Sequence, residues 1–239
     1  MAIKIMLDAG HYGNKYNKGA VEGYYESNMT WELQGYLKKE LESYGFEVGT
    51  TRAEKDKDLE VYARGQKAKG YDLLLSLHSN SIDSEPTKRV VVIPPMNGKG
   101  DALAEKLGTC VVKAMNLKND KYWYHQIYKR EYPNKPGVDY YGVIRGAVAA
   151  GVVGIIIEHS FHSNKEACAW LMNSANLMLL AKAEAETIAA HYGYKKKADA
   201  DILYCVQVGA YGVKANADAM LKKLKAAGFD GFIATKPKN

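Results

Sequence analysis

The sequence predicts an α/β fold: a twisted, mostly parallel sheet flanked by helices, followed by a small β-α-β module. Five short apolar segments have the composition of strands, and longer segments with helical periodicity lie between them. This alternation is typical of parallel sheets, because parallel strands need a long crossover connection. A third observation, a charged stretch that begins near residue 195, separates the final module from the rest.

The expected strands are rich in β-branched and other large apolar residues, and glycine or polar residues bound them. They span residues 3–7, 46–50, 71–77, 89–93 and 152–157. The last of these is apolar along its length except for Gly154, which is typical of a strand buried on both faces. The expected helices between and after them span residues 27–44, 59–69, 100–115 and 165–190.

Domain boundaries follow from the stretch that begins at residue 195. Gly193 predicts the end of the last large helix, because glycine readily adopts the left-handed conformation that closes helices. We therefore expect a catalytic domain over 1–194, a charged linker over 195–201 and a module over 202–239. Within the module we expect a strand at 204–208, a helix at 216–227 and a strand at 231–235.

Composition narrows the function classes. The net charge of +6 is mild and the basic residues are dispersed, so we do not expect nucleic-acid binding. No apolar run reaches the roughly 18 residues of a membrane span, and the first residues lack a secretory pattern. We accordingly expect synthesis in the cytoplasm without a signal peptide. Cys110, Cys168 and Cys205 are odd in number and lack metal-ligand spacing, which favours reduced structural thiols.

Candidate site residues lie at strand ends. His11 follows the first strand, His78 follows the third, and Glu158 ends the buried strand at 152–157, where an unpaired charge is costly. Because parallel strands end at one edge of a sheet, these side chains should converge. Two histidines and a carboxylate form a common ligand set for catalytic zinc. Spacing alone does not decide whether Glu22, Glu26 or Glu158 supplies the carboxylate.

Five motifs extend this interpretation, in order along residues 3–192: LDAGH (7–11), GAVEGYYESNMTWEL (19–33), TTR (50–52), SLHSN (76–80) and IIEHSFHSN (156–164). Together they resemble the zinc-dependent N-acetylmuramoyl-L-alanine amidases of the amidase-3 family. The resemblance implies Zn²⁺ bound by His11, Glu26 and His78, with Glu158 as the catalytic glutamate. It also implies the substrate, bacterial peptidoglycan, cleaved between N-acetylmuramic acid and L-alanine by a zinc-bound water.

The chain departs from the family after Glu158. The family has a small or apolar residue and then Gly-Phe there, whereas this chain has His159, Ser160, Phe161 and His162. If the strand continues, His162 lies on the side of Glu158 and His159 on the other, and we interpret both as ordinary hydrogen-bonded residues. Other residues receive individual interpretations: a sugar-stacking wall for His125, a helix cap for His191, structural roles for Arg52 and Arg64, and proximity to the groove for Arg145.

The tail resembles the opening half of a sporulation-related (SPOR) repeat, a module that binds peptidoglycan glycan strands. We expect two tails to associate by two-fold symmetry, which makes the protein a homodimer. The leading biological hypothesis is a bacteriophage endolysin that acts on the cell wall. The alternatives are a bacterial autolysin or sporulation or germination amidase, another zinc peptidase or carboxypeptidase of similar fold, and a wall-binding protein with an inactive site.

Overall fold

The computed structural model describes residues 2–83, 87–117, 123–196 and 206–235. The chain divides into two compact units, Met1–Lys197 and Ala198–Asn239, and each is described by itself. Most of the linker expected at 195–201 lies outside the described residues, since only Lys195 and Lys196 fall within them. Among the described helices, none is both long enough and apolar enough to cross a membrane.

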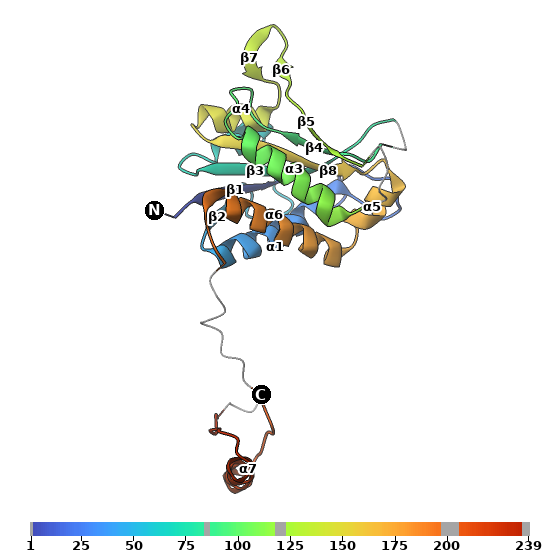
Figure 1. Ribbon diagram of the computed structural model, residues 1–239. Coiled ribbons are helices and arrows are strands. Elements are labelled where there is room, and N and C mark those ends of the chain that lie inside the picture. Colours follow the sequence, from blue (N-terminus) through green and yellow to red (C-terminus); the bar gives the residue numbers. More distant parts are fainter. Residues whose placement is uncertain (1, 84–86, 118–122, 197–205, 236–239) are drawn as a thin grey trace. The chain divides into compact units, whose positions relative to one another are not determined.

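The first unit is built on a six-stranded sheet with the order β2-β1-β3-β8-β4-β5 (Figure 1). Its strands are β1 (Lys4–Ala9), β2 (Glu47–Thr50), β3 (Leu73–Asn80), β4 (Val90–Ile93), β5 (His125–Ile127) and β8 (Val153–Phe161). The first three and β8 are mutually parallel, whereas β4 runs antiparallel to β8 and pairs in parallel with β5. The mostly parallel α/β sheet predicted from the sequence is confirmed.

Helices cover both faces of this sheet, because alternate strand residues point to opposite sides. Leu73, Leu75 and Leu77 join one apolar cluster, and Leu74 joins the other. The larger cluster packs beneath α1 (Glu26–Tyr44), α3 (Asp101–Met115), α5 (Lys165–Leu171) and α6 (Ser174–Tyr192). The smaller cluster includes residues of α4 (Gly142–Ala149), which packs closely on α2 (Val61–Gln66).

Several boundaries differ from the sequence-based expectation. The segment 165–190, expected as one helix, is two helices: α5 ends at Leu171, and the side chain of Asn173 accepts a hydrogen bond from the backbone N–H of Ala175 at the start of α6. Strands β1, β3 and β8 extend two to four residues further than expected, so His78 and Glu158 lie within strands. The short elements β5, β6 (Glu131–Tyr132), β7 (Lys135–Asp139) and α4 were not expected.

The second unit contains the helix α7 (Lys214–Ala226), close to the expected 216–227. The strands expected at 204–208 and 231–235 are wrong where the structure describes them: residues 206–208 and 231–235 are not strands, and residues 204–205 lie outside the described part. A strand needs a paired neighbour and an apolar face to cover. Over residues 206–235 the structure supplies neither, since α7 buries no residue and Val206 and Phe232 are 88% and 77% exposed.

The thiols within the described residues match the expectation from their spacing. Cys110 is half-buried and Cys168 buried, and both are free. Burial raises the pKa of Cys110 to about 12, so this thiol stays protonated at neutral pH. Cys205 lies outside the described residues.

Candidate metal centre

The turn after β1 brings His11 against β3. The backbone N–H of Gly10 donates to the carbonyl of Leu77 at 3.0 Å. A Cβ on Gly10 would lie 2.4 Å from Cε1 of His78, so only glycine permits this approach. His11 itself has a left-handed backbone with φ of 59°, which is uncommon for a residue other than glycine. Such strain persists only where neighbouring contacts enforce it.

Two buried arginines provide those contacts. Arg64 donates from Nη2 to the carbonyl of His11 at 2.9 Å and from Nη1 to that of Ala9 at 3.0 Å. Arg52 donates to the same Ala9 carbonyl at 2.8 Å. Arg64 also lies 3.4 Å from the buried carboxylate of Asp8. Both guanidinium groups therefore hold the backbone of the His11 turn, in agreement with the structural roles expected for them.

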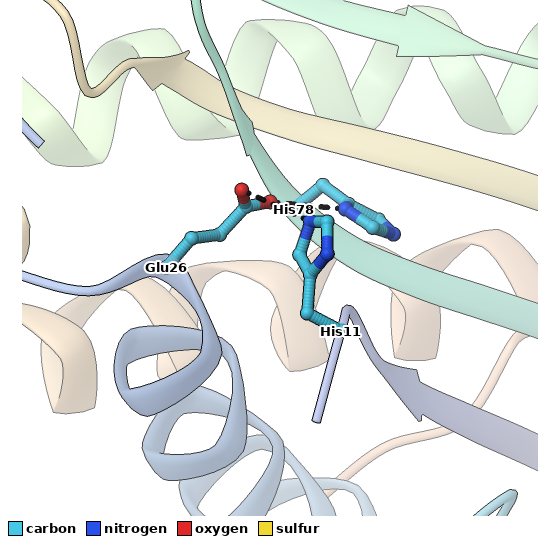
Figure 2. Close-up of side chains that lie close together, drawn as sticks. All are labelled: His11, Glu26 and His78. Carbon is cyan, nitrogen blue, oxygen red and sulfur yellow. Dashed lines mark hydrogen bonds and ion pairs between the residues drawn. The ribbon is translucent and has the colours of Figure 1, made fainter. Parts of the chain in front are cut away.

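The carboxylate of Glu26 links the two histidines. Glu26 is the first residue of α1 and is 1% exposed. Its Oε2 lies 3.1 Å from Nε2 of His11, and its Oε1 lies 3.0 Å from Nδ1 of His78 (Figure 2). The backbone N–H of Ser79 and the amide of Asn17 each donate to Glu26 at 2.9 Å. Three elements thus place three side chains at one point, and two further donors fix the carboxylate.

Electrostatics favour the charged carboxylate at this point. Burial by itself would raise the pKa of Glu26, but the hydrogen bonds from His11 and His78 hold it well below its ordinary value. Burial likewise acts to lower the pKa of His78, yet the hydrogen bond and charge of Glu26 raise it to about 9. An anion flanked by two imidazoles is therefore the stable arrangement of the side chains.

These residues fit a zinc ion. Ligand atoms from His11, Glu26 and His78 all lie within 4.8 Å of one another. A tetrahedral zinc with ligands at about 2.1 Å separates its ligand atoms by about 3.4 Å, which lies within that limit. Two nitrogens and a carboxylate oxygen are also the donor types that zinc prefers in hydrolytic sites.

Glu158 stands beside this cluster on β8, directly opposite His78 in the β3–β8 register. Its Oε2 is buried and forms no hydrogen bond to any described residue. Burial raises the pKa of Glu158 to about 7, and the nearby His78 opposes that rise. A carboxyl group poised near neutrality, with a free oxygen, can both accept and return a proton.

Both unusual histidines after Glu158 are hydrogen-bonded, as expected. His159 is completely buried, with Nε2 2.7 Å from Glu184 and Nδ1 2.9 Å from the carbonyl of His78. His162 binds the hydroxyl of Ser79 at 2.9 Å and lies 3.9 Å from Glu26. Each therefore contacts the end of the strand that carries the ligand His78.

The remaining candidates, His125, His191 and Arg145, are not part of the cluster of His11, Glu26 and His78. His125 on β5 pairs with Glu105 of α3 at 2.8 Å, and His191 lies in the last turn of α6. Arg145 donates to the carbonyls of Asp139 and Tyr140 and lies over the ring of Tyr132.

Sequence reasoning missed three residues that support the site: Asp8, Asn17 and Ser79. Asp8 directly follows the apolar strand expected at 3–7, and a carboxylate at that position was a signal that the sequence offered. Asn17 and Ser79 gave no comparable signal, because no helix or strand period links either residue to Glu26, which lies 9 and 53 residues away from them.

Comparisons with known proteins agree with this geometry. The profile of the N-acetylmuramoyl-L-alanine amidase family matches residues 5–190, and that of the SPOR domain matches residues 180–239. A sporulation-specific N-acetylmuramoyl-L-alanine amidase of Bacillus subtilis (strain 168) is 24% identical over 98% of this chain and 85% of its own length. The N-acetylmuramoyl-L-alanine amidase CwlM of Bacillus licheniformis is also 24% identical, over 97% of this chain and 84% of its own.

A solved structure shows the same fold. The N-acetylmuramoyl-L-alanine amidase from Clostridium difficile 630 superposes with a TM-score of 0.66 at 17% identity. The superposition covers 80% of this chain and 97% of that one.

Proposed function

Because this chain belongs to the N-acetylmuramoyl-L-alanine amidase family, we propose that it is a zinc hydrolase of bacterial peptidoglycan. The bond cleaved is the amide between N-acetylmuramic acid and L-alanine of the stem peptide. His11, Glu26 and His78 bind the zinc, and Glu158 is the general base. The observation that carries the proposal is the convergence of three ligand atoms beside a buried carboxylate with a free oxygen.

Each residue has a distinct part in the reaction. When bound, zinc polarises the scissile carbonyl and lowers the pKa of water at its open position. Glu158 accepts the proton of the attacking water and returns it to the leaving amine, which suits its raised pKa. Glu26 remains a carboxylate throughout, because its hydrogen bonds from Ser79 and Asn17 fix both of its oxygens.

Substitution of the two glutamates tests these roles. Glu158→Gln should retain one zinc per chain and lose at least about a hundredfold in rate, the usual scale for a general base. Glu26→Gln should lose the zinc itself. Glu22→Gln is the matched control, because Glu22 is exposed and lies in the same segment as Glu26, so zinc and rate should both be kept.

The assay measures zinc by elemental analysis and product from purified cell wall. New amino termini of L-alanine should appear without new reducing sugar ends. Release of terminal D-alanine instead would indicate a carboxypeptidase. If Glu158→Gln lost its zinc while Glu26→Gln kept it, Glu158 would be the zinc ligand and Glu26 the general base.

The second unit supports a homodimer. Its helix α7 buries none of its residues, and Phe229 and Phe232 are 65% and 77% exposed. An apolar surface of this kind needs a cover, and a second copy supplies an identical one by two-fold symmetry. Light scattering should find a dimer for the full chain and a monomer for residues 1–194. A full-length monomer at micromolar concentration would contradict this proposal.

Two biological roles remain proposals. The first is the bacteriophage endolysin. The second is a bacterial autolysin or sporulation amidase, which one observation favours: the curated relative from Bacillus subtilis is named as sporulation-specific and aligns along nearly the whole chain. Expression of the gene during sporulation would support the second role, and expression on phage induction would support the first.

A further inference from the structure

A charged pair lies buried in the core on the far side of β8 from Glu158. The side chains of His159 and Glu184 are both 0% exposed, and Nε2 of His159 lies 2.7 Å from Oε1 of Glu184. Glu184 belongs to α6, where its neighbours Ala181 and Ala185 are completely buried. A buried pair of this kind is often no more stable than two well-packed apolar residues. Its presence therefore calls for a reason other than stability.

The hydrogen bonds of the pair define where its protons lie. Nδ1 of His159 is 2.9 Å from the carbonyl oxygen of His78, which can only accept, so Nδ1 carries a proton. The short contact between Nε2 and Glu184 then holds one further proton, shared by the two groups. Both ring nitrogens are thereby engaged, so Glu184 fixes the orientation in which His159 donates to His78.

The contact to His78 occurs where the sheet is irregular. His78 pairs with Glu158, but Asn80 pairs with Phe161, so β8 has one extra residue in this interval. Ser160, within it, has a φ of 65°. Such a bulge disrupts the local ladder of backbone hydrogen bonds and redirects side chains. Here the imidazole of His159 binds the backbone of the neighbouring strand at the ligand residue itself.

We propose that His159 and Glu184 are positioning residues for the metal ligand His78. By holding the carbonyl of His78 at the bulge, they fix where its imidazole meets Glu26. This inference rests on the proposed function, because it takes zinc as the ion that His78 binds. It extends the set of residues that determine zinc binding to α6, which packs with α1 on the same face of the sheet.

Replacement of the whole pair separates positioning from stability. In His159→Leu/Glu184→Met, two apolar side chains replace the buried pair, so the full-length protein should remain folded with stability equal to or above that of the wild type. Its zinc affinity, measured by competition with a chromogenic chelator, should fall at least tenfold. The absorption spectrum of the Co²⁺ form should change as well, because His78 is displaced.

Two single variants complete the experiment. Glu184→Gln can still donate a hydrogen bond to Nε2 of His159, so its zinc affinity should stay within threefold of the wild type. Leu180→Ala, one turn earlier on α6 and also fully buried, should lower stability and leave zinc affinity unchanged. If that double variant does not fold, a second fully apolar replacement of the pair, His159→Phe/Glu184→Leu, takes its place, with the same tenfold criterion.

Each outcome of these measurements either supports or overturns the inference. Zinc affinity of the double variant within threefold of the wild type overturns the inference, and so does an equal loss of affinity in Leu180→Ala. Wild-type protein that bound no zinc would refute the proposed function as well. Wild-type zinc binding that is lost in His78→Ala but kept in the double variant would overturn this inference alone.

Discussion

Arg64 is the residue whose loss should most disturb the His11 turn. It is 4% exposed and makes four hydrogen bonds: to the carbonyls of Leu59, Ala9 and His11 and to the carboxylate of Asp8. Arg64→Met leaves the Asp8 charge buried without its cation, and breaking a buried pair in this way costs about 3–5 kcal/mol.

The lower end of that range applies here, because the hydroxyl groups of Thr51 and Ser76 still donate to Asp8 in the variant. We therefore expect urea unfolding to show a loss of about 3 kcal/mol with an unchanged slope. Zinc affinity should fall in parallel, since the carbonyl of His11 loses its donor.

Two controls identify the cause of the loss. Lys67→Met removes an exposed cation that makes one hydrogen bond to the carbonyl of Thr51, and it should cost no more than about 1 kcal/mol. Asp8→Asn/Arg64→Met removes the stranded charge and should recover at least about 1 kcal/mol relative to Arg64→Met. A loss below about 1 kcal/mol in Arg64→Met, or no recovery in the double variant, would refute the reasoning.

Three further predictions concern the site and the core. Gly10→Ala should abolish zinc binding, measured by elemental analysis, because the added Cβ would collide with the His78 ring. The control Gly35→Ala has open space around it in α1, and urea unfolding should show a free energy of unfolding raised by up to about 1 kcal/mol. Zinc at a hundredfold over its Kd should stabilise the wild type by about 2.7 kcal/mol, and calorimetry should find no such shift in His78→Ala. Leu37→Ala, at a fully buried position of α1, should cost about 2–5 kcal/mol on urea unfolding, and a smaller loss would mean that the core collapses into the cavity.

Much of the fold follows from local patterns. The apolar strands at 3–7, 71–77 and 152–157 were predicted because continuous apolar runs are typical of strands covered on both faces, and β1, β3 and β8 lie there. The short strands β5, β6 and β7 were missed, because two to five residues are too few to show a period. The antiparallel direction of β4 has no local signature, since direction depends on how the chain returns to the sheet.

The sequence predicted part of the candidate site, and the rest required the family resemblance or the structure. The positions of His11, His78 and Glu158 after apolar segments predicted their convergence, because parallel strands end at one edge. The choice of Glu26 over Glu22 came from the resemblance to a family, and spacing did not supply it. The structure places Glu26 at the first residue of α1, within 3.1 Å of both histidines.

The sequence by itself determined which chemical groups this protein has and roughly where along the chain its strands deliver them, because hydrophobic periodicity is local. Only the tertiary structure decided which groups meet. The bulge in β8 between Glu158 and Phe161 arises from the pairing register of two strands far apart in sequence. The contact between His159 and Glu184 likewise depends on how α6 packs against the sheet, and packing of this kind is a property of the assembled core.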